Sequence, residues 1–153
     1  EAEGSYEVLS LAEVKKLASE GILKSTELLA DAHLSLTGAS GKVGLYYDQI
    51  NDRWLLPKGN APSTHIVKQS HVRLAEIVTN EQLSRLTAAA LDIEVPESFI
   101  INTGAAQDRQ VLFATKRYDR RISDRSKLLD RYPCPLRLHQ EDLDIPPIPL
   151  LMC

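Results

Sequence analysis

The sequence predicts an α+β fold, in which a small twisted antiparallel sheet packs against one long helix and two short helices come first. Two observations predict it. Short runs of β-favouring residues are separated by turn residues, and an amphipathic pattern with helical spacing covers residues 74–91. The resulting order is strand, strand, strand, long helix, strand, strand, which is typical of an α+β domain.

The composition describes a mildly acidic protein of single-domain size. The chain has 153 residues, of which 43% are hydrophobic and 25% charged, with a formal net charge of -3. This balance does not favour direct binding to nucleic acid. No apolar run approaches the roughly 18 residues of a membrane span, and Cys134 and Cys153 do not form a disulfide framework. We therefore expect a cytoplasmic protein with no membrane association.

Residues 1–33 are expected to form a leading helical segment. Residues 1–6 lack the order of a secretory signal and suggest a frayed start. Ser10 and Glu13 form a capping box that begins a helix, which Gly21 ends. A second short helix is expected from Ser25 to about His33.

Residues 34–121 contain the expected sheet and long helix. The predicted strands are, in order, Val43–Tyr47, Arg53–Leu56, Ser63–Lys68, Ser98–Asn102 and Val111–Lys116. Residues 122–153 are expected to be an irregular linker and a poorly ordered tail, because charge is dense up to Asp130 and prolines interrupt the rest.

A glycine-containing segment precedes the first of these strands. Residues 37–42 superficially match a Walker phosphate loop, but Leu36 stands where that loop needs glycine and Val43 stands where it needs serine or threonine. A glycine-rich turn beside strands is also the device with which protein kinases cover ATP phosphates. From spacing alone, phosphate contact and simple shaping of a hairpin both remain open.

Lys68 ends the third predicted strand, and the next helix carries two carboxylates, Glu76 and Glu81. A strand lysine followed by a helix glutamate is the pattern with which kinases hold nucleotide phosphates. Taken singly, the lysine could be a solvated strand residue and each glutamate a surface charge. The histidines lack metal-ligand spacing with each other or with Cys134, and no serine lies in a nucleophile elbow, so a metal site and a hydrolase are not expected.

Five segments together resemble the HipA-like serine/threonine kinases. Residues 35–42 are similar to the family's Ser-hydrophobic-x-Gly-Ala-Gln-x-Lys loop, and residues 63–68 to its Ser-Thr-His-Ile-hydrophobic-Lys strand. The other three are Asn80-Glu81 in the helix, Arg117-Tyr118-Asp119-Arg120 at the hinge, and residues 137–142 beyond it. They span about two-thirds of the chain and occur in the family's order.

The resemblance implies an ATP site and a regulatory site. Lys68 would hold ATP phosphates with Glu81 as its partner, Gly38 would lie in the phosphate-covering loop, and backbone groups near Lys116 and Tyr118 would meet adenine. Ser35 matches the serine that such kinases autophosphorylate to switch themselves off. The resemblance further implies ATP with Mg as cofactor, growth control in a toxin-antitoxin system, a helix-turn-helix antitoxin as partner and an aminoacyl-tRNA synthetase as substrate.

The chain also departs from the family. Ser40 stands in place of the usual Gln, Lys116 in place of a frequent Glu, and the catalytic Asp, Asn and metal-binding Asp of the family's helical lobe have no counterpart after Asp142. We therefore expect only the amino-terminal, ATP-gripping lobe of such a kinase, truncated and without turnover by itself.

Two alternatives remain. The chain could be a non-enzymatic interaction module that binds an antitoxin or a complementary catalytic lobe, because a lobe without its partner exposes a surface that is normally covered. It could also be an unrelated α+β binding domain whose motifs match by chance.

Overall fold

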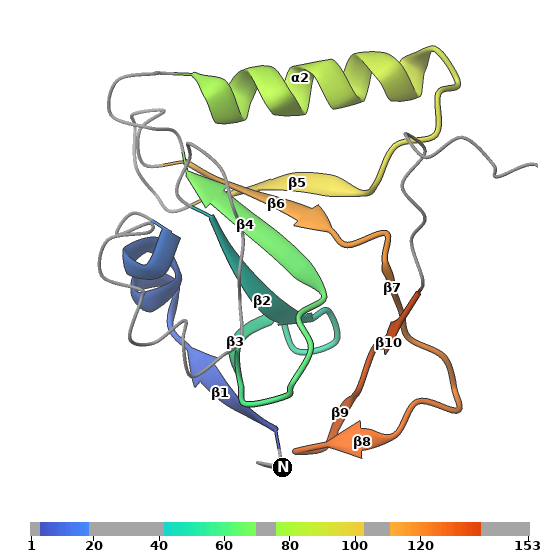
Figure 1. The fold of residues 1–153 in the computed structure, drawn as a ribbon. Helices are drawn as coiled ribbons and strands as arrows, with labels where there is room; N and C mark the ends of the chain where they lie inside the picture. The colour runs from blue at the N-terminus through green and yellow to red at the C-terminus, as the bar shows by residue number, and fades with distance from the viewer. Residues whose placement is uncertain (1–3, 19–41, 70–75, 103–110, 139–153) are drawn as a thin grey trace, which may run out of the picture.

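A six-stranded antiparallel sheet forms the centre of the chain (Figure 1). The computed structural model describes residues 4–18, 42–69, 76–102 and 111–138, and within them the strand order is β1-β3-β2-β4-β6-β5. The strands are β1 Ser5–Leu9, β2 Lys42–Asp48, β3 Arg53–Lys58, β4 His65–Gln69, β5 Ser98–Ile101 and β6 Leu112–Lys116, and α2 spans Ile77–Ala90. The α+β class and the antiparallel sheet are therefore confirmed.

β1 corrects the expectation of a frayed start. It pairs along its whole length with β3, from Ser5 opposite Lys58 to Leu9 opposite Trp54. Five residues without a clear alternation give little local signal, and the strand is stabilised by pairing with a segment some fifty positions away. The helix that follows covers residues 11–18 and has the expected capping box, with the Ser10 N–H donating to Glu13 Oε2 at 2.7 Å. The second expected helix lies outside the described residues.

One face of the sheet packs against the helix at residues 11–18. Val14 and Ala18 of that helix are buried, at 0% and 1% exposure, among apolar side chains of five strands. The strand members of this core are Val43, Leu45, Trp54, Leu56, Val67, Ile101, Leu112 and Ala114. Because successive strand residues point to opposite faces, their neighbours in sequence lie on the other side of the sheet.

Two separate elements cover that other face, one at each end. α2 lies over β5 and β6, whereas the segment that contains Leu129 and Tyr132 lies over β1, β2 and β3 (Figure 1). In the second covering, Tyr6 and Tyr46 pack against Tyr132 with ring centroids 5.8 and 5.7 Å apart. Tyr46 also donates its hydroxyl to the carbonyl of Pro133 at 3.0 Å, and burial raises its pKa to about 12, so the hydroxyl stays protonated.

Residues 122–138 are therefore not the irregular linker that we expected. They contain the short strands β8 Leu128–Leu129, β9 Tyr132–Pro133 and β10 Leu136–Arg137, and β10 pairs with β7 Arg120–Arg121 just after the hinge. Of the prolines that argued against regular structure, Pro133 ends β9 and Pro135 lies between β9 and β10, positions where proline is tolerated, and the others lie outside the described residues. The rest of that range, residues 139–153, lies outside the described part of the chain, so the expectation of a poorly ordered tail remains a prediction.

A Schellman motif ends α2, the helix that contributes Glu81. The N–H of Ile93 donates to the Ala88 carbonyl at 3.0 Å and the N–H of Asp92 donates to the Ala89 carbonyl at 3.1 Å. Asp92 has φ of 57°, in the left-handed region that favours glycine. An L side chain is strained in this conformation, so Asp92 destabilises the Schellman motif that ends α2.

Replacing Asp92 with glycine is expected to raise the free energy of unfolding by about 0.5–1 kcal/mol, because glycine adopts this conformation without strain. Asp92→Ala is the matched control, since it shortens the side chain but keeps the strain. It is expected either to leave the free energy of unfolding unchanged or to lower it. Urea denaturation followed by circular dichroism measures both. Equal stabilisation by the two substitutions would contradict the argument from φ.

Candidate functional site

A partly buried ion pair joins β4 to α2. Lys68 Nζ donates to Glu81 Oε1 at 2.8 Å and to Oε2 at 2.9 Å, and the two side chains are 23% and 25% exposed. Lys68 lies on the face that α2 covers, opposite Lys42 of β2 on one side and Phe113 of β6 on the other. Of the two carboxylates considered from the sequence, the partner is Glu81, whereas Glu76 is exposed at the N-cap of α2.

Arg85 is a third member of this network, and it was not among the site residues expected from the sequence. Its Nη2 donates to the same Glu81 Oε1 at 3.0 Å, and its guanidinium carbon lies 5.4 Å from the Phe113 ring centroid. Lys68 Nζ lies 5.9 Å from the same ring. The four-residue spacing from Glu81 to Arg85 could have predicted the contact, because side chains four apart meet on a helix surface.

A cavity of about 240 Å³ extends from this network to the end of β6. Its lining consists of Ile66, Lys68, Arg85, Pro96, Thr115, Lys116, Arg117, Tyr118 and Asp119. Lys68 and Arg85 thus lie at one end of the cavity. The backbone turn after β6, which we call the hinge (residues 117–119), lies at the other, where Arg117 is paired with Asp119. Such an arrangement can receive an anionic group and a planar group in one elongated ligand.

Contacts within the hinge and with the two residues before β4 hold the hinge in place. Arg117 donates from Nε and Nη2 to the two carboxylate oxygens of Asp119, at 2.9 and 2.7 Å, and from Nη1 to Ser63 Oγ at 3.0 Å. The Arg117 N–H donates to the Thr64 carbonyl at 2.8 Å. The hydrogen bonds and charge of Arg117 keep the pKa of Asp119 below its usual value, against the opposing effect of burial. The Ser-Thr pair before His65 therefore anchors the hinge.

The two positions expected to meet adenine, Lys116 and Tyr118, differ in the structure. The Lys116 N–H donates to the Glu97 carbonyl at 2.9 Å and is already used. Tyr118 is 70% exposed and makes no hydrogen bond within the described residues, so its N–H and C=O can receive a ligand. The Lys116 side chain is also engaged, in an exposed ion pair with Glu97 at 3.0 Å.

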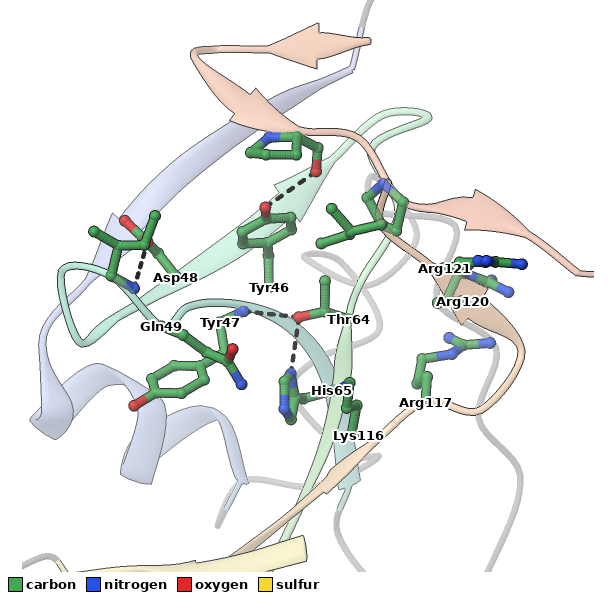
Figure 2. A pocket seen from close by; sticks show the side chains of 14 residues that line it. Tyr46, Tyr47, Asp48, Gln49, Thr64, His65, Lys116, Arg117, Arg120 and Arg121 are labelled. Atoms are coloured by element: carbon green, nitrogen blue, oxygen red, sulfur yellow. Dashed lines mark hydrogen bonds between the residues drawn. The ribbon is translucent and has the colours of Figure 1, made fainter. Parts of the chain in front are cut away.

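Figure 2 shows a second cavity, of about 480 Å³, which shares Lys116 and Arg117 with the first. On its wall, Thr64 Oγ1 accepts from the Tyr47 N–H at 2.9 Å and lies 2.9 Å from His65 Nδ1 (Figure 2). Burial, together with the charge of Lys116, lowers the pKa of His65 to about 4. His65 is therefore a neutral member of the polar network at the start of β4.

Two of the predicted site residues cannot be placed. Gly38 and Ser35 lie outside the described residues, as do His71 and His139, so the predicted roles of Gly38 and Ser35 remain predictions. Lys42, the last residue of the loop motif, is the Cα partner of Lys68. Within the described residues there is no group of three or more His, Cys, Asp or Glu that could hold a metal ion. No helix in this part of the chain is long and apolar enough to span a membrane.

Comparison with known proteins identifies the family. The family model described as the HipA-like C-terminal domain matches residues 34–144, well over half of the chain, and the chain therefore belongs to this family. The fold is similar to that of HipA from Shewanella oneidensis MR-1, solved in complex with HipB and operator DNA, with a TM-score of 0.59 and 22% identity. The alignment covers 87% of this chain but only 28% of that HipA chain.

Acid is expected to destabilise the protein through His65. The unfolded chain takes up a proton near pH 6.5, whereas folded His65 resists protonation until about pH 4, so the free energy of unfolding falls as the pH drops between these values. The expected loss is on the order of 2–3 kcal/mol. His65→Gln should flatten this part of the pH profile, measured by urea denaturation from pH 7.5 to 4. A variant slope equal to that of the wild type would show that His65 is not the titrating group.

Proposed function

We propose that this chain contains the nucleotide-binding lobe of a HipA-like serine/threonine kinase. The observation that carries the proposal is the Lys68–Glu81 ion pair at one end of the hinge cavity. In protein kinases, a lysine on the third strand of the lobe contacts the ATP phosphates and pairs with a glutamate from the following helix. β4 is the third strand after the glycine-containing segment, and α2 is the next helix.

The geometry suggests how the lobe would hold ATP. The Lys68 ammonium would contact the phosphates, and Glu81 would keep this ammonium in position over Phe113. The backbone of Tyr118, which makes no hydrogen bond within the described residues, would hydrogen-bond the adenine edge, and the apolar side chain of Ile66 would pack beneath the base. The glycine-containing segment around Gly38 precedes Lys42, the first residue of β2, and would cover the phosphates from that end of the strand.

Magnesium is not accommodated by the described residues alone. They provide no cluster of three or more acidic, histidine or cysteine side chains, and the one carboxylate at the phosphate end, Glu81, is already bonded to two cations. A nucleotide-bound Mg²⁺ would therefore reach this lobe through the phosphates. No step proposed for this chain depends on the ion.

Phosphoryl transfer requires a positioned base and metal-holding residues. No Asp of the 153-residue sequence is followed by Asn five positions later, the spacing found in kinase catalytic loops. We therefore propose that the chain binds nucleotide but does not by itself transfer phosphate. By family analogy, a complete kinase would act on an aminoacyl-tRNA synthetase, would be restrained by a helix-turn-helix antitoxin, and would be switched off by phosphorylation of Ser35.

Calorimetry with ATP tests the binding proposal. The wild-type chain is expected to bind ATP, and Lys68→Met is expected to weaken binding at least tenfold, because it removes a charge-assisted contact to the phosphates. The matched control is Lys58→Met, since Lys58 is an exposed strand lysine paired with Glu7 at the other end of the sheet. Equal ATP affinity in the wild type and Lys68→Met would refute the role of Lys68.

Turnover is a separate test. Incubation of the purified chain with radiolabelled ATP and a protein acceptor such as casein is expected to yield no labelled protein above background. Labelling that disappears in Lys68→Met would show that the chain is catalytically complete and would overturn this part of the proposal.

A second candidate function is a non-enzymatic interaction module. It is favoured by the exposed apolar side chains on and after α2, where Leu83, Leu86, Leu91 and Ile93 are 61%, 57%, 67% and 55% exposed. If the chain bound no nucleotide but formed a stable complex with a helix-turn-helix antitoxin, and Leu83→Ser with Leu86→Ser abolished that complex, this candidate would replace the first.

A further inference from the structure

We infer that Arg85 and Lys68 together form a two-cation phosphate subsite, in which Arg85 binds the polyphosphate directly. This inference rests on the proposed nucleotide-binding function and assigns a second phosphate-binding residue at the same site. Its starting point is that the Arg85 guanidinium and the Lys68 ammonium both bond to a single carboxylate oxygen, Glu81 Oε1, at 3.0 and 2.8 Å. The two cations therefore lie next to each other.

The charges in this network do not balance. Glu81 supplies one negative charge, whereas Lys68 and Arg85 supply two positive charges, and the side chains are only 22–25% exposed. A lysine-glutamate pair alone would be neutral, so Arg85 adds the surplus positive charge. Solvent screens that charge incompletely at this depth, which makes the position attractive to an anion.

One donor group of Arg85 has no acceptor among the residues that the structure describes. Nη2 bonds to Glu81, but Nη1 is buried and makes no hydrogen bond within the described residues. An unsatisfied buried donor is unfavourable, and more so when it belongs to a charged group. A phosphate oxygen would satisfy it, and the fork of guanidinium N–H groups suits phosphate geometry.

Phe113 holds the two cations on one side of the cavity. The ring is fully buried, and Arg85 and Lys68 lie 5.4 and 5.9 Å from its centroid, within the range of cation-π attraction. Both residues also line the 240 Å³ cavity, which Tyr118 lines as well. A ligand with its base at Tyr118 would thus direct its phosphates toward both cations.

The alternative is a purely structural role, in which Arg85 only steadies Glu81 and the helix. Ligands with different numbers of phosphates distinguish the direct role of Arg85 from the structural role. A direct phosphate contact affects ligands with several phosphates and spares adenosine, whereas a loosened helix weakens all ligands together. Inorganic tripolyphosphate isolates the subsite from the adenine end.

The experiment compares tripolyphosphate, ATP and adenosine by calorimetry, without added metal, on the full 153-residue chain. Arg85→Met keeps an unbranched side chain over Phe113 and is expected to weaken tripolyphosphate and ATP about tenfold, while adenosine binding stays within twofold. Arg85→Lys should recover part of the loss. The control Arg125→Met removes an exposed arginine elsewhere and should change nothing. Circular dichroism and urea denaturation check that each variant folds.

The outcomes are distinct. Unchanged tripolyphosphate affinity in Arg85→Met, equal weakening of all three ligands, or no tripolyphosphate binding by the wild type would each overturn the subsite. If the wild type binds tripolyphosphate through Arg85 but binds ATP no more tightly than tripolyphosphate, the adenosine part of ATP contributes no affinity. In that case the subsite stands and the nucleotide-binding function fails. If ATP binding depends on Lys68 but not on Arg85, the function stands and the subsite fails.

Discussion

The carboxylate of Glu81 is the group on which the candidate site depends. It accepts hydrogen bonds from Lys68 and Arg85, which come from a strand and a helix, and so joins α2 to the centre of the sheet. Without it, two partly buried cations would face each other beside the Phe113 ring with no counterion among the described residues. Removing one partner of such a buried network is more costly than its net contribution to stability suggests.

The division of the sheet into two covered ends explains where the cavity lies. α2 covers β5 and β6, whereas Leu129 of β8 and Tyr132 of β9 pack over β1, β2 and β3 (Figure 1). Part of β4 remains between these two coverings. Lys68 and Ile66 face this interval from β4, and the hinge closes its far end. Two unrelated packing contacts therefore create the space for a ligand that neither contact could form alone.

Much of the site could be predicted because its signals are local. Lys68 follows a β-branched run, Glu81 lies in the first half of an amphipathic helix, and the capping box at Ser10 sets the start of a helix from neighbouring residues alone. Arg85 has a local signal too, the spacing of four from Glu81, but many surface pairs share it. The bond from Arg117 to Ser63 has none, because the two residues are 54 positions apart in the chain.

The sequence by itself determined the class of fold and the order of the central elements. Its pattern indicated Lys68 with two candidate partners, Glu76 and Glu81, and only the resemblance to the family favoured Glu81. Side-chain periodicity and capping act within a few residues, and a single chain displays them directly. Only the tertiary structure decided that residues 5–9 join the sheet, that residues 128–133 cover it, and that Arg85 shares the carboxylate of Glu81 with Lys68. These features arise from contacts between distant segments, whose free energy depends on burial and charge in the folded chain.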